Sequence, residues 1–146
     1  MFRAYKYRIY PTKEQEILIQ KTFGCVRFMY NRLLADSKEE YNTTGNTKIY
    51  TPAKYKEEFQ WLKEVDSLAL CNARMHVKAS YSNFFRKLKQ GKTGKKVGFP
   101  KFHSKRSGKR VYTTNCINNS IRLEDKKLRL PKLDSTSSQL KEGVDD

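Results

Sequence analysis

The residues of this chain that could do chemistry are its cations, and they are concentrated in one segment. Between Asp66 and Glu124 the sequence has no acidic residue, and the 57 residues from 67 to 123 include 14 Lys and Arg. The rest of the chain is nearly neutral, with 17 basic and 15 acidic residues, so this segment supplies almost all of the net charge of +16. Such a concentration of cations binds the phosphate backbone of nucleic acids by releasing counterions. The alternative is a solubilising surface, which usually mixes both signs.

Phosphate contacts are expected from the lysines and arginines of this basic segment, because such contacts hold a protein on nucleic acid without reading its sequence. Phe99 and Phe102 lie among these cations. Their rings could stack on bases or pin the segment to the domain, and both roles stay open. The expected backbone contacts are Arg74, Lys78, Arg86, Lys87, Lys89, Lys92, Lys95, Lys96, Lys101, Lys105, Arg106, Lys109 and Arg110.

No catalytic or metal-binding pattern accompanies these cations. Two-metal cleavage of a phosphodiester needs converging carboxylates, and the basic segment has none. The nearest acids, Glu124 and Asp125, suit a hairpin turn. Cys25, Cys71 and Cys116 lack Cys-x-x-Cys spacing, so we expect free thiols rather than a zinc site. We therefore expect no catalytic residue, no metal and no cofactor.

The composition indicates a small globular protein without a membrane span. No run approaches the ~18 consecutive apolar residues of a membrane helix. Residues 1–11 alternate charged and aromatic side chains, unlike a signal peptide. We expect a cytoplasmic protein with no membrane partner.

Residues 2–10 have the alternating pattern of a β-strand, with three apolar side chains on one side. A single strand is not stable alone, so we expect it to pair with a later hairpin. That hairpin is predicted at 120–133, where two alternating segments flank a polar turn. Residues 111–115 also have the composition of a strand.

Helices are predicted between these strands. Thr12 and Gln15 form a capping box that begins the first one. Gly24 interrupts its pattern, and we predict a turn there, which gives a helix-turn-helix at about 13–41. The alternative is one continuous helix that tolerates the glycine at a cost of ~1 kcal/mol. A short helix is predicted over about 52–60.

The longest clear helix is predicted over about 67–89. Its apolar side chains recur at helical spacing and form a single stripe for burial. The other face carries Arg74 and Lys78 and no acid. Because a solvated helix normally alternates charge signs, we infer that this polar face meets an anionic partner.

The predicted fold class is α+β. It has a small antiparallel β element built from the N-terminal strand and the C-terminal hairpin, with an inserted helical lobe of about four helices and a disordered C-terminal tail. The predicted boundaries are a first strand at 1–11, a helical lobe at 12–90, a basic loop with strands at 91–133 and a tail at 134–146. The tail is predicted to be disordered because it is polar and has no periodicity.

Several sequence motifs between residues 2 and 133 resemble, in order, the N-terminal part of the TnpB (OrfB) family encoded by insertion sequences. They are YKYRIYPTKEQ, TFGCVRFMYNRLL, WLKEVDSLAL, YSNFFRKLKQGK, KVGFPKF and LRLPKL. Members of this family are RNA-guided DNA endonucleases that are also called transposases. The resemblance implies a β element like the family's wedge domain and a helical lobe like its recognition domain. It also implies two partners, a structured guide-like RNA and double-stranded DNA.

The resemblance implies a second set of contacts, with the short DNA motif beside the target. In relatives, this duplex is contacted from the start of the long helix and from the strand after the basic loop. Thr and Asn side chains at such positions suit hydrogen bonding to base edges in a groove. The matching positions in this sequence are Ser67, Leu68, Cys71, Asn72, Tyr112, Thr114 and Asn115.

The family pattern stops at Leu133. In the family it continues into a RuvC-like nuclease domain with three metal-binding carboxylates and a zinc ribbon. We therefore expect a truncated, nucleic-acid-binding fragment that is not an enzyme and holds neither divalent metal nor zinc. We expect a monomer associated with the bacterial nucleoid. The alternative function is a stand-alone helix-turn-helix repressor that binds the DNA of its own insertion sequence.

Overall fold

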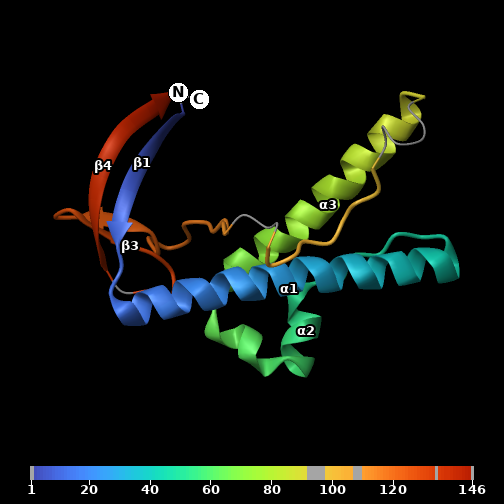
Figure 1. The fold of residues 1–146 in the computed structure, drawn as a ribbon, viewed down its shortest axis with the longest axis horizontal. Coiled ribbons are helices and arrows are strands. Elements are labelled where there is room, and N and C mark those ends of the chain that lie inside the picture. The colour runs from blue at the N-terminus through green and yellow to red at the C-terminus, as the bar shows by residue number, and fades with distance from the viewer. Residues whose placement is uncertain (1, 92–97, 107–109, 134, 146) are drawn as a thin grey trace. The chain divides into compact units, whose positions relative to one another are not determined.

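The computed structural model describes residues 2–91, 98–106, 110–133 and 135–145. Two compact units divide the chain: residues 1–21 with 115–146, here called the sheet unit, and residues 22–114, here called the helical unit. The predicted α+β class is confirmed. Figure 1 shows the elements, which in chain order are β1 (Arg3–Tyr10), α1 (Lys13–Thr44), α2 (Pro52–Glu58), the 3-10 helix η1 (Gln60–Glu64), α3 (Ser67–Lys89), β2 (Arg122–Glu124), β3 (Lys127–Arg129) and β4 (Thr136–Asp145).

The sheet unit contains one antiparallel sheet with the strand order β1-β4-β3-β2. The predicted hairpin is confirmed as β2 and β3, in which Glu124 pairs with Lys127. Asp125 and Lys126 form its turn with φ values of 46° and 62°. Two successive residues with positive φ are typical of a type I′ turn, whose twist matches that of the strands beside it.

β4 occupies residues 136–145 of the segment 134–146, for which the sequence predicts a disordered tail. It pairs with β1 over the whole of that strand, from Arg3 opposite Asp145 to Tyr10 opposite Ser137 (Figure 1). β4 therefore lies between β1 and the hairpin. The sequence predicts that the N-terminal strand pairs with the hairpin directly, and it does not. The ladder is made by backbone groups, so a polar segment can supply the partner that an isolated strand needs.

α1 is one continuous helix, so the predicted turn at Gly24 is wrong. The predicted capping box is confirmed: the Thr12 amide donates to Gln15 Oε1 at 2.9 Å, and the Gln15 amide donates to Thr12 Oγ1 at 3.3 Å. After the glycine, Met29 and Leu33 are completely or almost completely buried. Burying such side chains contributes about 1.5–3 kcal/mol each, which exceeds the ~1 kcal/mol cost of a glycine within a helix.

α3 has the bounds predicted for the longest clear helix. Of the predicted apolar stripe, the first four side chains, Leu70, Ala73, Val77 and Tyr81, are buried, whereas Phe84 is half-buried and Leu88 is exposed. Leu70 and Val77 are fully buried. Polar contacts join the helix to α1, since the hydroxyls of Tyr81 and Ser37 lie 2.7 Å apart and those of Ser80 and Tyr30 lie 3.1 Å apart. These contacts place α3 beside α1 within the helical unit.

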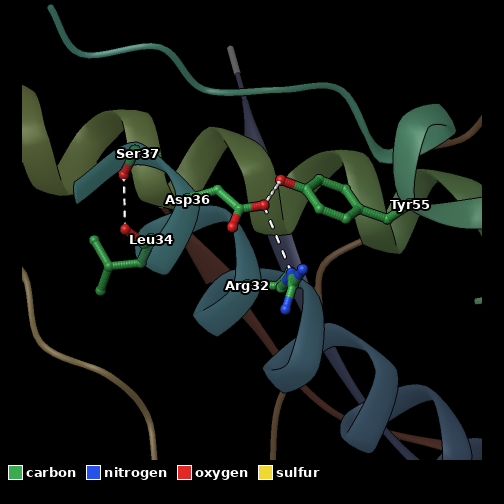
Figure 2. A network of polar contacts seen from close by, with 5 residues as sticks. All are labelled: Arg32, Leu34, Asp36, Ser37 and Tyr55. Atoms are coloured by element: carbon green, nitrogen blue, oxygen red, sulfur yellow. Dashed lines mark hydrogen bonds and ion pairs between the residues drawn. The ribbon is translucent and has the colours of Figure 1, made fainter. Parts of the chain in front are cut away.

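A polar network attaches α2 to α1, as Figure 2 shows. The buried Tyr55 donates its hydroxyl to Asp36 Oδ2 at 2.5 Å, and the same oxygen lies 3.6 Å from Arg32 Nε. Burial first, and then the hydrogen bond to Asp36, raise the pKa of Tyr55 well above its ordinary value. Beside this network the Ser37 hydroxyl donates to the Leu34 carbonyl at 2.9 Å.

Candidate nucleic-acid interface

The exposed face of α3 carries cations and no carboxylate. Lys78 is exposed near the middle of the helix, and Arg86 and Lys89 are exposed in its last turn, where Lys87 is half-buried. Cations at the C-terminal end of a helix are stabilised by the helix dipole. The exposed side chains that follow one another along this face at helical spacing are Ser67, Cys71, Met75, Lys78, Ser82, Arg86 and Lys89.

Arg74 belongs to the scaffold rather than to this face. Its guanidinium donates to two backbone carbonyls of the loop before α2, that of Tyr50 at 2.9 Å and that of Ile49 at 3.0 Å. The side chain is half-buried. The sequence could not reveal this role, because the two carbonyls lie 24 and 25 residues earlier in the chain.

Residues 98–106, here called the pinned segment, are attached to α3 through Phe99. Its ring lies edge-on to those of Tyr81 and Phe84, with centroids 5.6 and 5.1 Å away. Lys38 Nζ of α1 lies 4.8 Å from the Phe99 centroid and 4.5 Å from that of Phe102, in cation–π geometry. The structure therefore gives Phe99 the pinning role, whereas Phe102 remains 51% exposed.

Asn31 of α1 fixes the pinned segment at a second point. Its side-chain amide donates to the His103 carbonyl and accepts from the His103 amide, both at 2.8 Å. The His103 ring stacks on Tyr30 with centroids 3.9 Å apart and planes 5° apart. Burial, with a smaller contribution from His76, lowers the pKa of His103 below its ordinary value, which favours the neutral ring.

The pinned segment therefore holds its cations on a fixed backbone. Lys101, Lys105 and Arg106 are exposed there, and Arg110 is exposed four residues later. Binding costs less when the segment is already ordered, because little chain entropy remains to be lost. Four of the predicted phosphate contacts, Lys92, Lys95, Lys96 and Lys109, lie outside the described residues.

Asp66 joins the start of α3 to the chain that follows the pinned segment. One of its carboxylate oxygens accepts from the Leu68 amide at 3.0 Å as the helix N-cap, and the other accepts from the Thr114 hydroxyl. Tyr112 packs edge-on against Phe23 of α1, 5.7 Å between centroids. Burial, and then the charge of Asp66, raise the pKa of Tyr112.

Residues 111–115 form no strand, contrary to the prediction. Side-chain contacts at Tyr112 and Thr114 hold the segment in place of a backbone ladder. Residues with a high strand propensity are those that suit a half-buried surface. In this segment they pack against helices instead of joining a sheet.

The predicted base contacts are brought together only in part. At the start of α3, Ser67 and Cys71 are exposed, and Leu68 and Asn72 are half-buried. Asp66 places Thr114 at the same end of the helix. Of the remaining two, Tyr112 is half-buried two residues before Thr114, and the exposed Asn115 is the first residue of the second part of the sheet unit.

Lys56 of α2 is a site residue that the sequence analysis missed. Its ammonium donates to the Ser67 hydroxyl at 2.8 Å and adds a cation beside the start of α3. Lys56 lies in a stretch of mixed charge that has no distinguishing pattern, so only the fold could place it here.

The described residues contain no group of three or more His, Cys, Asp or Glu side chains arranged to hold a metal ion. The three cysteines, all among the described residues, form no disulfide; Cys25 is buried, and Cys71 and Cys116 are exposed. None of the helices in this part of the chain has the length and apolarity that crossing a membrane requires.

A family model described as a helix-turn-helix domain, and named for OrfB, matches residues 1–46. In this structure those residues hold β1 and the unbroken α1. The family description therefore agrees with the sequence resemblance, although the helix has no turn at Gly24.

Three relatives extend the comparison beyond residue 46. A Streptomyces pristinaespiralis protein, whose name describes an RNA-guided DNA endonuclease, is 32% identical over 114 residues, which cover 73% of this chain and 26% of that protein. InsQ of Escherichia coli strain K12, with the same description in its name, is 29% identical over 139 residues, covering 90% of this chain and 32% of InsQ. Virulence protein VsdF of Salmonella dublin is 33% identical over 99 residues, covering 58% of this chain and 83% of VsdF.

This chain spans about a third or less of the length of the two relatives named as endonucleases. It spans most of VsdF. The family model over residues 1–46 and the two relatives named as endonucleases together identify an N-terminal helix-turn-helix region of the TnpB (OrfB) family in this chain.

Proposed function

We propose that this protein binds nucleic acid through the helical unit, with the exposed face of α3 and the pinned segment on the phosphate backbone. The observation that carries the proposal is the pinning of the segment by Phe99 and His103. This pinning holds the segment in which Lys101, Lys105 and Arg106 are exposed. All three belong to the stretch of sequence from 67 to 123, which has no carboxylate. Ordered cations without neighbouring acids favour a polyanionic partner.

The partners proposed are double-stranded DNA and a structured guide-like RNA. The names of two relatives support this choice, since they describe RNA-guided DNA endonucleases. The start of α3 is the proposed point of contact with base edges, because Ser67 and Cys71 are exposed there beside Thr114. Neutral hydroxyl groups donate to and accept from base edges in the grooves of a duplex.

We propose further that this chain binds without cleaving. The absence of acidic residues between 67 and 123 supports this, because hydrolysis of a phosphodiester by two metals needs carboxylates beside the bound backbone. The expected result is no magnesium-dependent nicking of a supercoiled plasmid beyond that of the heat-denatured protein. Nicking that requires the folded chain would contradict this part of the proposal.

The binding proposal is tested by fluorescence anisotropy of the full chain with a labelled duplex DNA and a labelled transposon-end RNA hairpin, titrated with salt. The variant Lys101→Ala/Lys105→Ala removes two exposed cations from the pinned segment. If each contacts one phosphate, the slope of log K against log salt falls by about 1.8 in magnitude on duplex DNA.

The matched control is Lys13→Ala/Lys63→Ala, which removes the same charge from exposed positions on α1 and η1. Its salt slope should match that of the unmodified protein. An equal loss of slope in both variants would show that only net charge matters, and the pinned segment would then have no special role.

The repressor alternative gains no support from the structure, since α1 lacks the turn on which it was based. It makes a distinct prediction in the same assay. A repressor would bind one duplex sequence more tightly than others and would keep that preference at high salt, because base contacts release no counterions.

A further inference from the structure

His103 makes two kinds of contact that hold the pinned segment on α1. Its ring stacks on Tyr30 with centroids 3.9 Å apart and planes 5° apart. Its backbone exchanges two hydrogen bonds with the Asn31 side chain, both at 2.8 Å. The ring can gain a proton near neutral pH, whereas the Asn31 amide cannot. The ring contact is therefore the part of the attachment that can respond to pH.

The Tyr30 ring is itself fixed between α1 and α3. Its hydroxyl lies 3.1 Å from that of Ser80, and the Ser80 hydroxyl donates to the His76 carbonyl at 3.0 Å. The surface on which the His103 ring stacks is therefore held by two helices. A change in the stack moves the pinned segment rather than Tyr30.

The charges around His103 are positive. Asp36 is the acid of α1 nearest in sequence to Asn31, and it is engaged by Tyr55 and Arg32 in the network with α2. The pinned segment lies in the stretch from 67 to 123, which has no carboxylate. The titratable and charged groups on the elements packed around the ring are Arg27, Tyr30 and Lys38 of α1, His76 of α3, and Lys101 and Lys105 of the pinned segment itself.

A proton on the His103 ring is unfavourable in this position for two reasons. Burial against Tyr30 removes water that would solvate the charge, and the neighbouring cations add charge of the same sign. Burial first, and then His76, lower the pKa of His103 from its ordinary value of 6.5. A released ring regains water and its ordinary pKa. Stacking therefore favours the neutral ring, and protonation favours release.

We propose that protonation of His103 releases the pinned segment from α1, so that a fall in pH loosens the cations that hold nucleic acid. The contribution of the ring to pinning is complete above pH 6.5 and is lost as the pH falls through the lower pKa of the stacked ring. The effect on binding rests on the proposed function, because fixed cations bind at a lower entropy cost than loose ones. The release itself is a property of the free protein.

The release is tested by hydrogen exchange of the full chain, followed by NMR from neutral pH to about pH 5. The His103 amide donates to Asn31 Oδ1, so its protection factor, corrected for the intrinsic exchange rate, measures attachment. Below pH 6.5 this protection should fall by up to about tenfold per pH unit. His103→Gln keeps the amide but cannot be protonated, so its protection should not change with pH. An equal acid loss in His103→Gln would overturn the proposal.

A second variant tests the origin of the effect without altering the pinned segment. His76→Gln removes a like charge from α3, so the ring of His103 should titrate closer to its ordinary value and the acid loss of protection should be smaller. The ring proton shifts of His103 give this titration directly. Titration of the unmodified protein at or above 6.5, or protection that stays constant while the ring titrates, would overturn the proposal.

Fluorescence anisotropy with the labelled duplex tests the effect on binding. Between neutral pH and about pH 5.5 the dissociation constant should rise more for the unmodified protein than for His103→Gln. Tighter binding of the unmodified protein at acid pH would overturn this effect, since the proton would then serve as a phosphate contact. Hydrogen exchange is measured without nucleic acid. A failure of release is therefore distinguishable from a failure of the proposed function, in which the duplex binds at neither pH.

Discussion

Thr114 donates its hydroxyl hydrogen to the carboxylate of Asp66, 48 residues earlier in the chain. The other oxygen of that carboxylate accepts from the Leu68 amide at 3.0 Å and caps α3. One side chain therefore begins α3 and also fixes the chain that follows the pinned segment. The residues proposed to contact base edges lie in the two segments that this carboxylate joins, the start of α3 and the chain around Thr114.

Asp66→Ala should destabilise the protein by about 1–3 kcal/mol, because an N-cap and a second hydrogen bond to a carboxylate are both lost. Asp66→Asn should cost less, since Asn is an equally good N-cap and its amide can still meet Thr114. Urea unfolding followed by circular dichroism measures both. Glu58→Ala, at an exposed position of α2, is the control; a similar loss there would deny Asp66 its special role.

Gly24→Ala should stabilise the protein by about 0.5–1 kcal/mol, because alanine favours a helix interior and the new Cβ would meet no atom within 4 Å. Gly45→Ala is the matched control. That glycine follows α1 with a φ of +77°, where a side chain is strained, so its replacement should destabilise. Thermal unfolding of the two variants gives opposite shifts if α1 is continuous; a destabilising Gly24→Ala would indicate a turn.

Asn31→Ala should release the pinned segment, because both hydrogen bonds to the His103 backbone are removed. Losing about 1–3 kcal/mol of local stability raises the open population about 5- to 150-fold. Trypsin cleavage after Lys101 and Lys105 should accelerate by a similar factor, as measured by mass spectrometry of timed digests. Asn83→Ala, at an exposed position of α3, should leave the rate unchanged; if both variants are cleaved alike, Asn31 does not hold the segment.

The stability of the protein should fall as the pH rises above 10. The pKa of Tyr55 is raised from its ordinary value of 10.0, so its contribution is complete below pH 10 and is lost as the pH rises toward the folded-state value. Burial raises the pKa of Tyr81 and Tyr112 in the same direction. The unfolding free energy, measured in urea at neutral pH and at several values above 10, should decline only in the alkaline range.

Tyr55→Phe separates the part of this decline that belongs to Tyr55. At neutral pH it should destabilise by about 1.5–3 kcal/mol, because a hydrogen bond to a carboxylate is lost. Above pH 10 its stability should fall less steeply than that of the unmodified protein. An alkaline decline identical to that of the unmodified protein would show that Tyr55 ionises normally.

Features with local causes could be predicted from the sequence. The capping box of Thr12 and Gln15, the helix at 67–89 and the hairpin around Asp125 each depend on residues within a few positions of one another. Capping, helical periodicity and turn chemistry act at that range. The concentration of cations between 67 and 123 is likewise a property of the sequence alone.

Features that depend on distant partners needed the fold. In the sequence, Arg74 and Lys78 are both cations on the polar face of one helix. Only the hydrogen bonds from Arg74 to the Ile49 and Tyr50 carbonyls show that Arg74 belongs to the scaffold. The sequence leaves open whether Phe99 stacks on bases or pins its segment to the domain. The contacts of its ring with Tyr81 and Phe84 decide for the pinning role. Gly24 remains within a helix because Met29 and Leu33 beyond it are buried by the rest of the unit.

β4 shows the physical reason most clearly. Residues 136–145 have no periodic apolar pattern, so nothing within them favours a strand. Their order comes from the backbone of β1, more than 120 residues earlier, which pairs with them along its whole length. Local free energies are encoded in neighbouring residues, whereas a backbone ladder depends on which segment the folded chain brings within hydrogen-bonding distance.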